Sequence, residues 1–182
     1  MGALSRIFLN GLAGAAASAA AAALFSRVEN GHAARPLNAI AHIYDGGAPP
    51  AHDGAAKRNT LLGLVIHSGA SIWWAAFYEA GLALQPQPRR LATAVAIAAL
   101  AYVVDYYVVN NRFRPGFEAY LSRHGLAAVY AALAAGYALS SGRSGRALVG
   151  ERQHERERTS LSGAARNAQL AAQEPRQLAA DR

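Results

Sequence analysis

The sequence predicts an all-α fold, an integral membrane four-helix bundle followed by a polar tail, and two observations lead to that class. The first is a set of four apolar stretches of 18 to 21 residues: Ile7–Ser26, Asn59–Tyr78, Leu91–Asn111 and Gly125–Gly142. A hydrocarbon core of about 30 Å requires about 20 helical residues, so each stretch is long enough to cross a bilayer. The second is that polar residues gather between and after these stretches, which hides the spans in a whole-chain mean hydropathy of only +0.07.

The expected helices lie near residues 5–26, 59–82, 91–111 and 122–141, so that residues 1–142 form a transmembrane domain. A soluble all-helical domain is the alternative, because alanine-rich apolar stretches also form buried helices. The four stretches leave no polar face for water, which favours the membrane. The tail, residues 143–182, is rich in Arg, Glu, Gln, Ala and Ser and predicts either a solvated helix or a disordered segment.

The first stretch also has features of a secretory signal, since Arg6 precedes an apolar run that contains Ala-x-Ala sites. That run is longer than the roughly 7–15 residues usual for a signal core. Gly11, Gly14, Ser18 and Ala22 also fall on one side of a helix, as the small residues of packed membrane helices do. We therefore expect a retained first span.

A short helix is expected in the first loop, between the first two spans. Pro36 suits the first turn of a helix, and Leu37, Ile40, Ala41 and Tyr44 then share one apolar side. This pattern predicts a helix of about two turns lying at the membrane interface.

Four spans place both termini on one side of the membrane. The N-terminus, the second loop and the tail hold eleven basic residues, and the first and third loops hold seven. Because basic residues favour the cytoplasmic side, both termini are expected in the cytoplasm. The heavy use of Ala, and of Arg over Lys, is typical of GC-rich bacterial genomes, which indicates a bacterial source.

Composition excludes several classes of function. The chain has no cysteine, which rules out disulfides, thiolate metal sites and cysteine nucleophiles. The net charge of +7 comes without a basic stripe or nucleic-acid motif, so lipid headgroups are favoured as partners over nucleic acid. The spacing of His42 and the His52–Asp53 pair fits no standard metal motif, and only His67 lies well inside a span, so neither metal nor haem nor any other cofactor is expected. No catalytic motif is convincing, and the chain is not expected to be an enzyme.

Two polar residues inside spans are the first candidates for chemistry, because a charge at the centre of a span costs about 2.5–3.5 kcal/mol on insertion scales. His67 and Asp105 lie at matched distances from the connection between the second and third spans, so they can meet at similar depth and share a hydrogen bond. The pair is either a proton relay or polar-ligand site, or a structural contact that Ser71 and Tyr102 complete. Glu79, at the end of the second span, is expected to be a satisfied interfacial acid.

A second candidate is a cluster of charged side chains in the first and third loops, which must emerge on the same side. Its members are Arg27, Glu29, His42, Arg112, Arg114 and Glu118. Closely spaced arginines can bind the phosphate or carboxylate of an anionic lipid headgroup. The alternative is a network of salt bridges between the loops.

Several strings resemble a group of small, multi-pass, uncharacterised inner-membrane proteins of proteobacteria. They are SRVENGHAARPLNAIAHIYDG, HSGASIWWAAFYE, AYVVDYYVV and RPGFEAYLSRHGLAAVYAALA, and they span about residues 26–138. The resemblance implies a four-helix membrane fold and no activity. A second histidine often follows the one at His67 in that group, whereas Ser68 stands there in this chain, which weakens a two-histidine metal or haem site.

Two functions are expected from different classes. The first is a structural, regulatory or assembly component that associates with itself or with another membrane protein through small residues, namely Gly11, Gly14, Gly63, Gly69, Ala132 and Gly136. The second is a small proton-coupled transporter, or a lipid- or anion-binding membrane protein, that uses His67 and Asp105.

Overall fold

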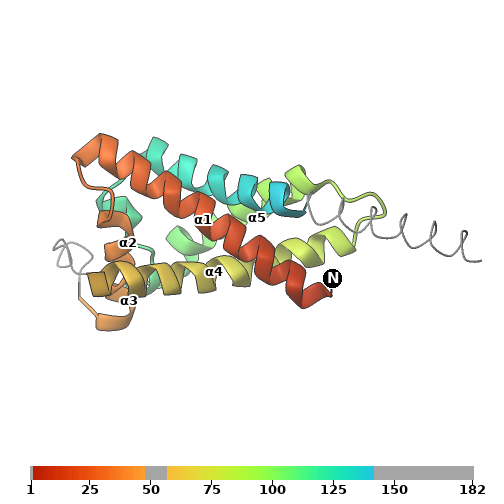
Figure 1. The fold of residues 1–182 in the computed structure, drawn as a ribbon, viewed down its shortest axis with the longest axis horizontal. Helices are drawn as coiled ribbons and strands as arrows, with labels where there is room; N and C mark the ends of the chain where they lie inside the picture. Colours follow the sequence, from red (N-terminus) through yellow and green to blue (C-terminus); the bar gives the residue numbers. More distant parts are fainter. Residues whose placement is uncertain (1, 48–56, 142–182) are drawn as a thin grey trace, which may run out of the picture. The chain divides into compact units, whose positions relative to one another are not determined.

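A computed structural model describes residues 2–47 and 57–141, and every regular element within those ranges is helical. Three helices are long and apolar enough to cross a membrane: α1 (Ala3–Asn30), α4 (Lys57–Ala83) and the helix Arg90–Val108. The last consists of α5 (Arg90–Val103) and the π-helical turn η2 (Val104–Val108). Residues 123–141 are also helical and pack into the same bundle (Figure 1).

The helix α1 lies antiparallel to α4 (Figure 1). Its small residues Gly11, Gly14, Ala15 and Ala22 are buried. Gly11 lies against Ile72, and Ser18 lies against His67. Residue numbers therefore rise along α1 as they fall along α4. At its end α1 stops at Gly31, whose φ of 78° lies in the left-handed region and whose N–H donates to the Arg27 carbonyl, a common helix stop.

Glycines at the helix crossings allow this close packing. A Cβ at Gly136 would lie 2.6 Å from the Ala13 carbonyl oxygen, a Cβ at Gly11 would lie 2.6 Å from the Ile72 Cα, and a Cβ at Gly14 would overlap the Tyr137 ring. Gly11, Gly14 and Gly136 thus allow close packing within the chain. Gly69 is exposed and would have open space around a Cβ.

The first loop differs from the single short helix that the sequence predicted. It forms two short helices, α2 (Arg35–Ile40) and α3 (His42–Asp45), at one end of the bundle (Figure 1). Ile40 is only 2% exposed, whereas Tyr44 is 70% exposed, so the expected apolar side is divided between the core and the outside. Gly63 of α4 allows α2 to pack this closely, because the Leu37 carbonyl occupies the place that a Cβ at Gly63 would need.

The third long helix, Arg90–Val108, ends before the predicted 91–111 does. After the π-helical turn the chain becomes extended at Val109, with ψ of 150°. The Asn110 side chain then accepts a hydrogen bond from the backbone N–H of Arg112 and so begins the 3-10 turn η3 (Asn111–Phe113). A second 3-10 turn, η4 (Phe117–Ala119), follows before the last helix. The predicted tail lies outside the described residues.

The long helices expose much of their apolar surface. In the most apolar 18-residue window of each, only 39%, 17% and 22% of the residues are buried, for α1, α4 and Arg90–Val108 in turn. Leu61, Val65, Trp73 and Phe77 form an exposed stripe along α4. Monomeric soluble proteins rarely expose contiguous apolar surface of this extent.

Candidate functional site

A cavity of about 100 Å³, the central cavity, lies between all the long helices and reaches the two loop segments at one end of the bundle. This volume exceeds the space that a single buried water needs, which is about 10–15 Å³ by the same kind of measure. Most of the wall is apolar, and its polar members come from four different elements: Ser18, His67, Ser71, Asp105 and Tyr130. Polar groups that converge in an apolar pocket are typical of a binding site.

His67 is held by the hydroxyl of Ser18, with its Nε2 2.9 Å from the Ser18 Oγ. The Ser18 Oγ also lies 2.7 Å from the Gly14 carbonyl oxygen, so Ser18 links His67 to the backbone of α1. The Phe117 ring packs against the imidazole in an edge-to-face arrangement, with 5.9 Å between centroids.

Asp105 accepts a hydrogen bond from the Tyr130 hydroxyl, with 2.7 Å between the oxygens. It belongs to the π-helical turn η2, and such turns often occur at functional sites because they change the direction of one side chain within a helix. Tyr130 is itself positioned by ring contacts with Tyr102 and Tyr106. The hydrogen-bond partner of Asp105 is therefore itself held in place by two neighbouring aromatic rings.

The structure brings the predicted pair to one cavity and gives each member a different partner. His67 pairs with Ser18 and Asp105 with Tyr130, in place of the expected hydrogen bond between them. Ser71, expected to complete the pair, donates to the Gly11 carbonyl instead. The depth of Tyr130 could not be estimated by counting residues from a tight connection. The connection before its helix, residues 109–122, is long and contains two 3-10 turns.

The predicted cluster of loop charges does not form as a unit, although both loops lie at one end of the bundle, where α2 contacts η4 and α3 contacts η3. His42 is buried, with Nδ1 2.6 Å from the Ala39 carbonyl oxygen. The Glu29 carboxylate accepts from both the backbone N–H and the hydroxyl of Ser122, at 2.8 and 2.7 Å, and so ties α1 to the start of the last helix.

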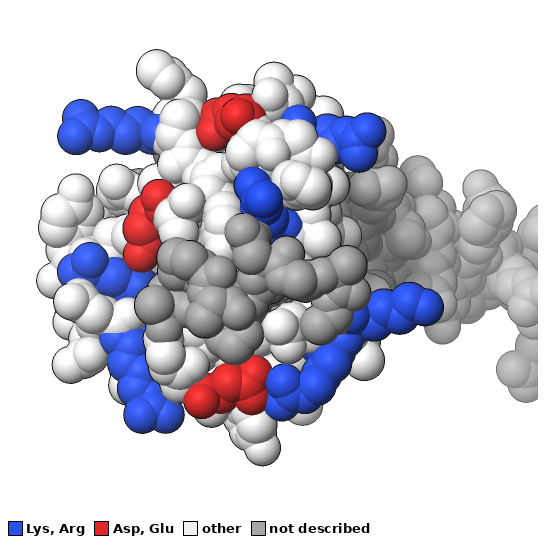
Figure 2. Space-filling view, turned by 90° about the vertical axis from the view of Figure 1, so that its left-hand side faces the viewer, with Lys and Arg blue, Asp and Glu red and all other residues white. Residues whose placement is uncertain are grey.

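The basic members of that cluster are spread over the surface of this end. Arg27 and Arg112 are exposed, as is Glu118, whereas Arg114 is half-buried. Figure 2 looks onto this end and shows basic side chains at separate places around the rim rather than in one patch. A salt bridge at this end joins Asp45 to Arg58 of α4, at 2.8 and 2.9 Å, and both residues lie outside the predicted cluster.

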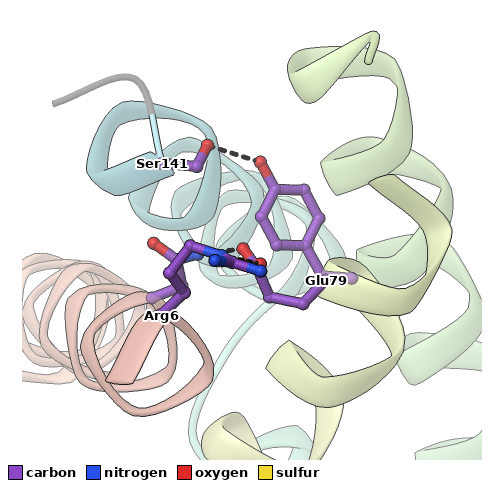
Figure 3. A network of polar contacts seen from close by, with 5 residues as sticks. Arg6, Glu79 and Ser141 are labelled. Atoms are coloured by element: carbon purple, nitrogen blue, oxygen red, sulfur yellow. Dashed lines mark hydrogen bonds and ion pairs between the residues drawn. The ribbon is translucent and has the colours of Figure 1, made fainter. Parts of the chain in front are cut away.

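A second polar network lies at the opposite end of the bundle, beside the start of α1 (Figure 3). Arg6 donates from Nε to Glu79 at 2.8 Å, and Asn10 donates from Nδ2 to the other carboxylate oxygen at 2.6 Å. The Tyr78 and Ser141 hydroxyls share a hydrogen bond of 2.7 Å next to it. Glu79 is thus a satisfied acid, as predicted, and it joins α1 to α4.

Neither a protein-family model, nor a curated protein, nor a solved structure matches this chain, so its candidate site is interpreted from its own residues.

Proposed function

We propose that this chain is a multi-pass protein of a bacterial inner membrane, with four membrane-spanning helices and both termini in the cytoplasm. The exposed apolar surface of the long helices supports this, because lipid chains solvate such a surface favourably and water does not. The fourth span is the helix that includes residues 123–141, which packs beside α1 through Gly14 and Gly136. The burial of Gly11, Gly14, Ala15 and Ala22 supports α1 as a permanent part of the bundle.

Membrane insertion is tested by an alkaline carbonate wash of isolated membranes, after which the protein should stay in the pellet. Release into the supernatant would contradict the proposal. Intact mass measurement of the purified protein tests the first span separately. A mass that lacks residues 1–26 would show that α1 is removed as a signal.

Within that membrane protein, the central cavity serves as the solute site of a small proton-coupled carrier. The observation that carries this proposal is the convergence of His67 and Asp105 on one cavity between the long helices. An ionisable residue at membrane depth is costly and marks ion or proton pathways in other membrane proteins. A hydroxyl group from another helix orients each of them, Ser18 for His67 and Tyr130 for Asp105. Binding sites need such support from neighbouring side chains.

Proton flux into proteoliposomes, followed with an enclosed pH-sensitive dye, tests the carrier. Asp105→Asn and His67→Ala should each abolish the flux while the amount and elution volume of the protein stay unchanged. Glu118→Gln is the matched control, because it makes the same acid-to-amide change at an exposed residue outside the cavity. If the cavity variants only reduce yield, His67 and Asp105 are structural.

An assembly component remains the second candidate, and the exposed stripe on α4 favours it. Most of the glycines expected to bind another protein are used inside the chain, but Gly69 lies open between the exposed residues Val65 and Trp73. A partner helix could approach closely at that point. Crosslinking in native membranes should then give a dimer or a defined partner, and Gly69→Leu should abolish it.

A further inference from the structure

The charges around the central cavity favour a cationic ligand. Among the described residues, no Lys or Arg belongs to the wall, and Asp105 is its single acid. The partner of the His67 Nε2 is a neutral hydroxyl, that of Ser18. In a site of low polarity one negative charge attracts a cation strongly and repels an anion, because little water screens it.

The aromatic members of the wall favour an organic cation over a hard metal ion. Trp74, Phe113, Phe117 and Tyr130 line the cavity from four different elements. Aromatic faces attract a cation carried on carbon and nitrogen by cation–π interaction and leave the coordination shell of a metal incomplete. Among the described residues, no group of three His, Asp or Glu side chains could hold a metal ion.

The Asp105 carboxylate has the capacity to bind an ammonium group. A carboxylate offers about four acceptor positions, and the Tyr130 hydroxyl occupies one of them. The volume of about 100 Å³ restricts the ligand to a small molecule. An N–H donor of such a molecule would replace water as the partner of the carboxylate.

We propose that the cavity binds a small protonated amine, with Asp105 as its counter-ion and the rings of Trp74 and Phe117 around its alkyl part. This inference rests on the proposed carrier function and names the substrate class of the same site. A small carboxylate such as acetate has similar size and the opposite charge, and the cavity rejects it.

The chain contains its own reporter for this ligand. It has only two tryptophans, of which Trp74 lines the cavity and Trp73 is 63% exposed on the outer surface. The variant Trp73→Phe therefore leaves a single tryptophan at the site. Titration of this variant in detergent with methylammonium chloride should change the Trp74 emission and reach saturation, whereas sodium acetate at equal ionic strength should not.

Replacing the acid tests the assigned counter-ion in the same background. Asp105→Asn should weaken methylammonium binding by about tenfold or more, the loss expected for one charged hydrogen bond. Asp105→Glu keeps the charge and should retain most of the binding. The inference is overturned if acetate binds as well as methylammonium, or if the asparagine variant binds as well as the parent. The comparison of the two ions needs no change at Asp105, so it stands even if the asparagine variant does not fold.

The two proposals fail in different ways. Saturable methylammonium binding without proton flux would remove the carrier function and leave the amine site. Proton flux that depends on Asp105, without methylammonium binding, would retain the carrier and overturn the amine site.

Discussion

Glu79 lies near the end of an apolar helix and is only 9% exposed, so its charge needs partners. It has two, the Arg6 guanidinium and the Asn10 amide, both from the first turns of α1. Removing one member of a buried charged network usually costs more than the network contributes, because the remaining groups lose their partners. This contact therefore stabilises the placement of α1 against α4.

The change Glu79→Gln tests that role. It keeps the shape of the side chain and removes the charge, so we expect a loss of about 2 kcal/mol in the free energy of unfolding. Unfolding in mixed detergent micelles, followed by circular dichroism, provides the measurement. Glu118→Gln, at an exposed acid, should change stability by less than about 0.5 kcal/mol. Equal effects of the two changes would show that the network carries no stability.

At the scale of elements, the crossing of α1 and the last helix depends on the absence of side chains. Gly136 faces the backbone of Ala13 and Gly14, which cannot move away as a flexible side chain can. Gly69 is also a glycine within a long helix, α4, but a Cβ there would have no neighbour within 4 Å. The two glycines thus form a matched pair with opposite surroundings.

We expect Gly136→Ala to destabilise the bundle by about 1–3 kcal/mol, because the added methyl group must separate two helices. Gly69→Ala should instead be neutral or stabilising, since alanine favours a helix over glycine by about 1 kcal/mol. Thermal unfolding of both variants in detergent compares them directly. A destabilising effect at Gly69 as large as that at Gly136 would contradict the crossing.

The loop helices α2 and α3 are a second feature of this scale. Ile40 is buried and packs against Gly63 of α4, with 3.5 Å between the Ile40 Cβ and a Cβ built at Gly63. The ion pair between Asp45 and Arg58 closes the segment from outside, where solvent weakens it. Apolar packing is therefore expected to hold the segment more strongly than the ion pair.

Ile40→Ala should cost about 2–5 kcal/mol of stability, the usual range for a buried isoleucine. Tyr44→Ala removes a larger but mostly exposed side chain and should cost much less. Denaturant unfolding of both variants gives the comparison. If Tyr44→Ala costs as much as Ile40→Ala, the segment lies at the membrane interface, as its sequence pattern suggests, rather than inside the bundle.

For the whole molecule, the antiparallel arrangement places the second loop at one end and the first and third loops at the other (Figure 1). Exposed residues mark both ends, Gln87 in the second loop and Asn111 after the third span. The chain has no cysteine, so single cysteines can be introduced without removing any.

Labelling intact cells with a membrane-impermeant maleimide should therefore modify Asn111→Cys and leave Gln87→Cys unmodified if both termini are cytoplasmic. Lysed cells, in which both should react, provide the control for reagent access. The reverse pattern would invert the proposed orientation. Equal labelling of both residues in intact cells would contradict a membrane-spanning bundle.

The positions of the long helices follow from the sequence alone, because the length and hydropathy of a span are local properties. The structure has long helices at all four expected places, with bounds that differ by a few residues from those predicted. The largest differences are at the ends of the first and third spans. The extra turn before Gly31 and the early end at Val108 depend on a glycine and on a π-helical turn, which the apolar pattern does not encode.

The candidate site could be predicted only in part. Equal distances from a short connection brought His67 and Asp105 to one level, and both line the central cavity. Their partners, Ser18 and Tyr130, and the outward direction of Gly69 were decided by tertiary structure. The physical reason is rotation about the helix axis. A helix that is apolar on every side has no polar face to set its rotation, so packing against its neighbours determines which residues point inward.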